Sequence, residues 1–185
     1  MNNDVSGIIG ELQAIGADVR DSFGSLSAGQ VNWRPSPAAW SVGQCLDHLI
    51  KSNEGFYGEF DKLAAGTRKN SFWETFSPLS NFAGNYLVKS LKADDKKIKT
   101  ILEMTPPSEV DADIVKRFVR HQTELAAKIA AVADADWQKT VVTSPFFFLM
   151  TYKLDDGLRS IVEHEKRHVR QAKRVSETDG FPCEV

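Results

Sequence analysis

LDDGLRSIVEHEKRHVRQAKRV, residues 154–175, is the stretch that decides the fold and contains the candidate site. On a helical wheel most of its charged side chains fall on one arc, which predicts an amphipathic helix over this range. Glu165 is the exception, because it falls near the middle of the apolar arc. That apolar arc is formed by Leu154, Leu158, Ile161, Val162, Val169, Ala172 and Val175.

Two histidines of this predicted helix form a candidate metal site. His164 and His168 lie four residues apart on one flank of the apolar arc, with Gln171 one turn further on. At that spacing they point in the same direction and can bind one ion, and HEKRH at 164–168 matches the H-E-x-x-H pattern of zinc sites. Because an unpaired buried carboxylate is costly, Glu165 needs a partner. The sequence favours a metal site. The alternative is that Glu165 pairs with a cation of another helix and that both histidines are boundary residues.

The composition is that of an ordinary soluble globular protein. The chain has 185 residues, of which 42% are hydrophobic and 26% charged, with a net charge of −2, so we expect one domain over residues 1–185. No basic excess indicates nucleic-acid binding, and no apolar run approaches the ~18 residues of a membrane span. The N-terminus does not resemble a signal peptide, and Cys45 and Cys183 form no disulfide framework. We therefore expect a cytoplasmic protein without nucleic-acid or membrane partners.

Three more amphipathic helices are expected before the histidine helix. Apolar residues recur at three- and four-residue intervals over residues 4–23, 42–65 and 110–133. Ser41 followed by Gln44 fits a capping box at the start of the second of these helices. Residues 26–40 are expected to form a loop with one helical turn at its start, because their prolines exclude a long helix.

Two long connections complete the predicted fold. Over residues 66–105 the pattern loosens, and we expect one short helix at 86–100 with aromatic side chains that pack on the helices, or else cover a pocket as a lid. Residues 134–148 are expected to form a crossover loop with an extended piece at 140–143. Four long helices with two long connections predict an all-α fold, a four-helix bundle.

Two histidines outside the last helix are ambiguous from the pattern alone. His48 lies outside the apolar arc of the 42–65 helix, and by itself it indicates a surface histidine more than a ligand. His121 lies at the edge of the 110–133 arc, and Gln122 falls inside it. We consider His121 a candidate further ligand or a donor beside the site, with an ordinary boundary histidine as the favoured interpretation. Gln122 is expected to find a partner in the core.

Two segments together resemble the DinB-like superfamily, over nearly the full length of the chain. They are NWRP at 32–35 with WSVGQCLDHL at 40–49, and H-E-x-x-H-x-x-Q at 164–171. The resemblance implies a four-helix bundle of up-down-down-up topology. It also implies a divalent metal bound by one histidine of the second helix and two of the fourth, which by position are His48, His164 and His168.

The same resemblance implies chemistry on a small-molecule substrate. Three imidazole ligands leave an open coordination position, and a bound ion can activate water or deprotonate a thiol. Superfamily members include metal-dependent hydrolases, and transferases or isomerases that use low-molecular-weight thiols. We expect a metal-dependent hydrolase with Glu165 as candidate general base and Gln171 and His121 as neighbours of the ligands, or alternatively a thiol-dependent S-transferase or isomerase. Zinc or nickel is the expected metal, with iron or manganese as alternatives.

Two other function classes compete with these. A metallopeptidase of the H-E-x-x-H type takes its third ligand downstream of the motif, and only the 17 residues 169–185 follow His168, so this class is disfavoured. A non-enzymatic, stress-associated bundle whose metal holds helices together stays open, and the stability of the metal-free protein would distinguish it. A homodimer is compatible with the sequence, although no motif decides it.

Overall fold

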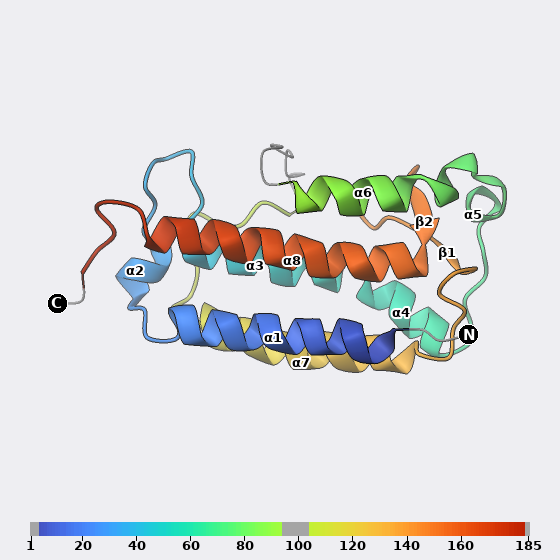
Figure 1. Ribbon diagram of the computed structural model, residues 1–185, viewed down its shortest axis with the longest axis horizontal. Coiled ribbons are helices and arrows are strands. Elements are labelled where there is room, and N and C mark those ends of the chain that lie inside the picture. Colours follow the sequence, from blue (N-terminus) through green and yellow to red (C-terminus); the bar gives the residue numbers. More distant parts are fainter. Residues whose placement is uncertain (1–3, 94–103, 184–185) are drawn as a thin grey trace.

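The computed structural model describes residues 4–93 and 104–183, and within them the chain is predominantly helical (Figure 1). The all-α class predicted from the sequence is confirmed, with one small two-stranded sheet in the described residues. The elements are α1 (Val5–Phe23), α2 (Ala28–Asn32), α3 (Val42–Glu54), α4 (Tyr57–Ala64), α5 (Phe72–Phe76), the 3₁₀ helix η1 (Pro78–Asn81), α6 (Ala83–Lys92), α7 (Ile114–Ala131), β1 (Val141–Thr143), β2 (Thr151–Lys153) and α8 (Leu154–Ser176).

The core lies among the four longest helices. α1 and α3 each pack against both α7 and α8. Figure 1 shows α1 and α8 running in one direction and α3 and α7 in the other. Leu12 of α1, Leu46 of α3 and Leu125 of α7 are completely buried, as their helical periodicity predicts. α6 lies along the outer side of α8, and it overlaps the short helix predicted at 86–100.

The start of α3 is fixed by the predicted capping box. The Ser41 hydroxyl accepts a hydrogen bond from the Gln44 backbone N–H at 3.1 Å, and the Gln44 side-chain oxygen accepts one from the Ser41 N–H at 3.0 Å. The Gln44 amide also donates to the carbonyl of Pro107 at 2.7 Å. Gly43 lies so close to the segment before α7 that a Cβ there would be 2.3 Å from the Val110 side chain. These contacts set the position of the first turn of α3, which precedes His48.

The predicted helix 42–65 is wrong in one respect, because it is two helices. α3 ends at Glu54 and α4 begins at Tyr57, with Gly55 and Phe56 between them. A Cβ at Gly55 would lie 3.1 Å from the Phe146 ring, so the interruption coincides with a close contact from a segment distant in sequence.

The connections contain more regular structure than predicted. Residues 66–105 include α5, η1 and α6, and the 94–100 part of the predicted short helix lies outside the described residues. The extended piece at 140–143 is confirmed as β1, whose antiparallel partner β2 was not predicted. The favoured packing of the aromatic residues is wrong for Phe72, Phe76, Phe82 and Tyr86, which are exposed. Among the described residues no helix has the length and apolar content needed to cross a bilayer.

Candidate metal centre

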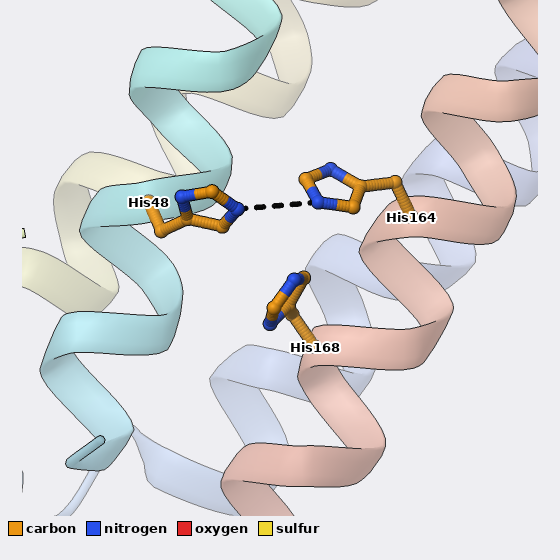
Figure 2. A group of neighbouring side chains, drawn as sticks. All are labelled: His48, His164 and His168. Carbon is orange, nitrogen blue, oxygen red and sulfur yellow. Dashed lines mark hydrogen bonds between the residues drawn. The ribbon is translucent and has the colours of Figure 1, made fainter. Parts of the chain in front are cut away.

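Three histidines from two helices converge on one point. Figure 2 shows His48 extending from α3 toward His164 and His168 of α8. The Nε2 atoms of His48 and His164 are 3.2 Å apart, and the His168 ring centroid lies 4.7 and 4.6 Å from those two rings. One ring nitrogen from each residue lies within 4.8 Å of the others. Two ligands at about 2.1 Å from a tetrahedral zinc ion would be about 3.4 Å apart, so this spacing is compatible with metal binding.

The tautomer of His48 is set by the backbone. Its Nδ1 lies 2.8 Å from the carbonyl oxygen of Met104, which can only accept, so Nδ1 carries the proton and donates. The lone pair is therefore on Nε2, the atom that faces His164. A metal-binding histidine commonly has this arrangement, with the second nitrogen hydrogen-bonded to a carbonyl. His48 is buried, at 5% exposed, and is not the boundary residue that its own helix pattern indicates.

The three imidazoles are electrically neutral near pH 7. Burial lowers the pKa of His48, and burial together with the neighbouring His168 lowers the pKa of His164 well below its usual value. Burial and repulsion from His48 lower the pKa of His168 to about 3. Its Nδ1 is buried without a hydrogen-bond partner among the described residues. Neutral rings with an unsatisfied buried nitrogen suit a bound cation, because a buried polar atom without a partner is costly.

Trp40 supports the cluster from the loop before α3. Its ring stacks on His168 with centroids 5.6 Å apart and planes 24° from parallel, and it lies 4.9 Å from the His48 ring. These contacts hold two of the three imidazoles in place.

A cavity of about 710 Å³ opens beside the three histidines. This volume is in the range of small-molecule sites. The wall away from the cluster is mainly apolar, from α6 and the β1–β2 hairpin, and the wall along α8 is polar. Besides the histidines, the residues that line the cavity include Trp40, Asn53, Phe56, Leu87, Leu91, Phe146, Met150, Ile161, Arg167, Gln171 and Arg174.

Glu165 faces away from this cavity, into the interior. One residue along a helix rotates the side chain by about 100°, so Glu165 and His164 lie on different faces of α8. Its Oε1 accepts hydrogen bonds from the side-chain amides of Asn53 and Gln122, both at 2.7 Å. Burial raises the Glu165 pKa to about 7, and those two hydrogen bonds oppose the shift. The partners are amides, not the cation that the alternative interpretation requires.

The family assignment follows from comparison with known proteins. The model of the DinB superfamily matches residues 11–172. The chain belongs to the DinB superfamily. It is 28% identical over 156 residues to the uncharacterized protein YuaE of Bacillus subtilis (strain 168), covering 82% of this chain and 86% of that protein. No solved structure matches the chain. Membership of the DinB superfamily and the three-histidine cluster are together compatible with metal binding.

The remaining candidates of this DinB-superfamily chain have different positions. Gln171 lines the cavity, and its side chain hydrogen-bonds to His168 and partly opposes the lowering of the His168 pKa. His121 lies outside the three-histidine group: its Nε2 accepts from the Asn53 amide at 3.2 Å, and its Nδ1 donates to the Tyr57 hydroxyl at 3.2 Å. Burial lowers the His121 pKa to about 4.

Asn53 was missed by the sequence reasoning. It lines the cavity and also connects Glu165 with His121. The sequence contains two signals for this contact. Asn53 is a polar residue near the end of the helix that contains His48, and Gln122 is a polar residue inside the apolar arc of another helix. Neither residue alone indicates that one amide links two helices, because that link depends on their tertiary arrangement.

Proposed function

We propose that this chain is a metal-dependent enzyme in which His48, His164 and His168 bind one divalent transition metal ion. The observation that carries the proposal is the convergence of three neutral imidazoles beside a cavity, with the His48 lone pair turned toward the cluster. Three protein ligands leave a coordination position free, as in catalytic zinc sites. Zinc or nickel suits nitrogen ligands best, with iron or manganese as alternatives.

Hydrolysis of a small molecule is the first candidate reaction. A bound ion would supply Lewis-acid activation of a water molecule or a thiol. In this reaction the chain orients the imidazoles through Met104 and Trp40, and the apolar wall around Leu87 and Leu91 excludes bulk water from the bound substrate. Glu165 as general base stays a prediction, although its carboxylate faces the interior.

Transfer of a low-molecular-weight thiol is the second candidate, and the composition of the cavity favours it. None of the described residues that line the cavity is Asp or Glu. Activation of water commonly uses a carboxylate base within hydrogen-bond reach. A thiol is more acidic than water and loses its proton on coordination, so it does not require that base.

The open cavity also bears on the non-enzymatic alternative. A structural zinc site is closed by four protein ligands, whereas the cluster contains three histidines among the described residues and lies beside a 710 Å³ cavity. If the metal only held helices together, its removal would unfold the protein. We expect the metal-free protein to keep its helical circular dichroism spectrum.

The test is elemental analysis of the purified, untagged protein, followed by activity assays with the ion that is found. We expect close to one equivalent of a transition metal, and turnover of either ester or amide substrates or a thiol with an electrophile. Absence of metal even after incubation with zinc or nickel would overturn the metal proposal. One equivalent of metal without turnover, in a protein that unfolds on chelation, would support the structural bundle instead.

A further inference from the structure

The side chain of Asn53 has one polar atom that the buried Glu165 cluster does not use. Asn53 is buried, at 1% exposed, and it lines the cavity. Its Nδ2 donates to Glu165 Oε1 at 2.7 Å and to His121 Nε2 at 3.2 Å. A side-chain amide nitrogen carries two protons, so both are used in these contacts. The carbonyl oxygen Oδ1 is the polar atom that remains.

The orientation of this amide is fixed by its partners. Exchange of Oδ1 and Nδ2 would place Oδ1 against the carboxylate oxygen of Glu165, and two acceptors in contact repel each other. The same exchange would place Oδ1 against His121 Nε2, which is an acceptor because His121 Nδ1 donates to the Tyr57 hydroxyl. Oδ1 therefore does not take the place of Nδ2 in the buried cluster.

The Asn53 Oδ1 atom is open to the cavity. It accepts no hydrogen bond from the described residues. Glu165 Oε2 and Gln122 Oε1 also lack partners there, but those two atoms are completely enclosed by protein and Oδ1 is not. Asn53 lines the cavity, whereas Glu165 and Gln122 are not among its described lining residues. A ligand that displaces water from Oδ1 must supply a donor, because an acceptor left without one is costly.

The contact with Glu165 makes Oδ1 a stronger acceptor. A carboxylate that accepts from the nitrogen of an amide polarises that amide, and hydrogen bonds in such a chain reinforce one another. None of the described residues that line the cavity is Asp or Glu, so a cationic donor would find no counter-ion in the wall. The complementary ligand group is therefore a neutral N–H or O–H.

The distance from Asn53 to the histidine cluster suits a short ligand. Asn53 follows His48 by five residues on α3, which at 1.5 Å rise per residue is about 7.5 Å along the helix axis. A chain of a few atoms and one hydrogen bond span such a distance. One small molecule can then contact the cluster with its reactive atom and Asn53 with its donor group.

We infer that Asn53 determines specificity, with its Oδ1 accepting a hydrogen bond from a neutral N–H or O–H of the small molecule whose reactive atom lies at the three histidines. This inference rests on the proposed function and specifies its substrate class. A site built to accept a hydrogen bond disfavours an analogue that lacks the donor, because the acceptor of the site is then left without a partner.

Cobalt-loaded protein and two matched thiols test the inference. 3-Mercapto-N-methylpropanamide carries an N–H where methyl 3-mercaptopropanoate has an oxygen, and the absorption band of cobalt–thiolate coordination reports the binding of each. We expect the ratio of amide affinity to ester affinity to be about fivefold higher in the wild type than in N53A, the size expected for one neutral hydrogen bond. The same ratio in both proteins would overturn the inference.

The matched control is Q122A. Gln122 donates to the same Glu165 oxygen as Asn53 does, but it is not among the described lining residues of the cavity. Q122A therefore disturbs the buried cluster without removing an acceptor from the cavity, and it should keep the wild-type ratio. A fall of the ratio in Q122A as large as that in N53A would mean that the cluster acts only through packing, and would overturn the inference.

Two further measurements use the wild type and the same assay. A hydroxyl donor is compared through 3-mercaptopropanol and its methyl ether, and a wild-type preference for one donor class identifies it as the N–H or the O–H source. If N53A does not fold, the NMR resonances of the Asn53 side-chain amide replace it. We expect the mercapto-amide to shift them more than the ester does, and equal shifts would overturn the inference.

A metal-free measurement separates this inference from the proposed function. If cobalt or the thiols do not bind, the metal proposal fails, and Asn53 is tested in the metal-free protein by fluorescence titration with N-methyl-1-naphthamide and methyl 1-naphthoate. A ratio of amide to ester affinity that N53A lowers and Q122A does not would still support the hydrogen-bond acceptor in the cavity. The same ratio in all three proteins would overturn it.

Discussion

His164 and Glu165 are adjacent in α8, yet they belong to two polar clusters of opposite character. His164 belongs with His48 and His168, where nitrogen atoms face one another beside a cavity. Glu165 belongs to a buried cluster with Asn53, Gln122 and His121, in which two amides donate to one carboxylate oxygen and the Asn53 amide also donates to His121. In the first cluster, ring nitrogens of three residues face one another and suit a cation. In the second, two amides satisfy Oε1 of Glu165, while its Oε2 is buried without a hydrogen-bond partner among the described residues.

The comparison shows that burial of a polar group does not by itself indicate a functional site. Glu165 is more deeply buried than any of the three histidines, at 0% exposed, and its contacts connect α8 with α3 and α7. A hydrogen-bonded buried network of this kind specifies how helices pack. Orientation decides between the two roles: the histidines face a cavity that can admit a ligand, and Glu165 does not.

The largest expected effect distinguishes the histidines of the two clusters. We expect H164A to lower metal affinity by more than about 100-fold, beyond the loss typical of an outer partner, because it removes a direct ligand. H121Q should change metal affinity little, since His121 contacts Asn53 and Tyr57 instead of the cluster. Competition with a chromophoric chelator measures both affinities. Equal losses of metal affinity in H164A and H121Q would mean that His121 belongs to the metal site, contrary to this prediction.

The next effect concerns the free energy of unfolding. E165A leaves the Asn53 and Gln122 amides without their acceptor and is expected to destabilise the protein by about 3 kcal/mol. E165Q keeps one oxygen for these amides and should cost about 1 kcal/mol. Urea denaturation measures both values, and equal stability of E165A and wild type would contradict a structural role.

E165Q also tests the general-base prediction. With its carboxylate in the interior, Glu165 has no described contact with the cavity except through Asn53. Unchanged turnover at full metal content would exclude Glu165 as the base. A large loss of turnover at unchanged metal content and stability would support the prediction and require Glu165 to act through Asn53.

The fold was predictable where helices show one apolar face. The range of α8 differs from its prediction by one residue, and α1 also matches closely, because periodicity depends on local sequence. The interruption at Gly55 was not predictable, since it coincides with a contact from Phe146. The exposed Phe72 and Phe82 show the same limit: an aromatic residue in a loose pattern does not reveal whether a neighbour covers it.

The candidate site was predictable only in part for a similar reason. His164 and His168 are recognised by spacing on one helix, and the structure brings both to His48. The pattern around His48 indicates a boundary position. The groups that bury His48 include Met104 and residues of α8, which are distant in sequence and do not affect the periodicity of its own helix. Its position in the site came from the family resemblance, not from periodicity.

The effect that is smallest near neutral pH is a pH dependence of the free energy of unfolding that belongs to the second cluster. The His121 pKa is about 4 in the folded state, below its ordinary value of 6.5, so the unfolded chain binds more protons between these values. The free energy of unfolding should therefore fall as pH decreases from 6.5 to about 4, by at most about 1.4 kcal/mol per pH unit from this group. Above pH 6.5 the His121 ring is neutral in both states and contributes no slope.

Comparison of wild type with H121Q isolates that contribution, because the other three histidines are present in both proteins. Urea denaturation of each protein at several pH values gives the two slopes. We expect the wild-type slope to be steeper within the window and the two slopes to agree above it. Equal slopes throughout would mean that His121 is not protonated selectively in the unfolded state. The buried network would then tolerate a charged imidazole, contrary to the neutral Nδ1–H tautomer that Asn53 and Tyr57 select.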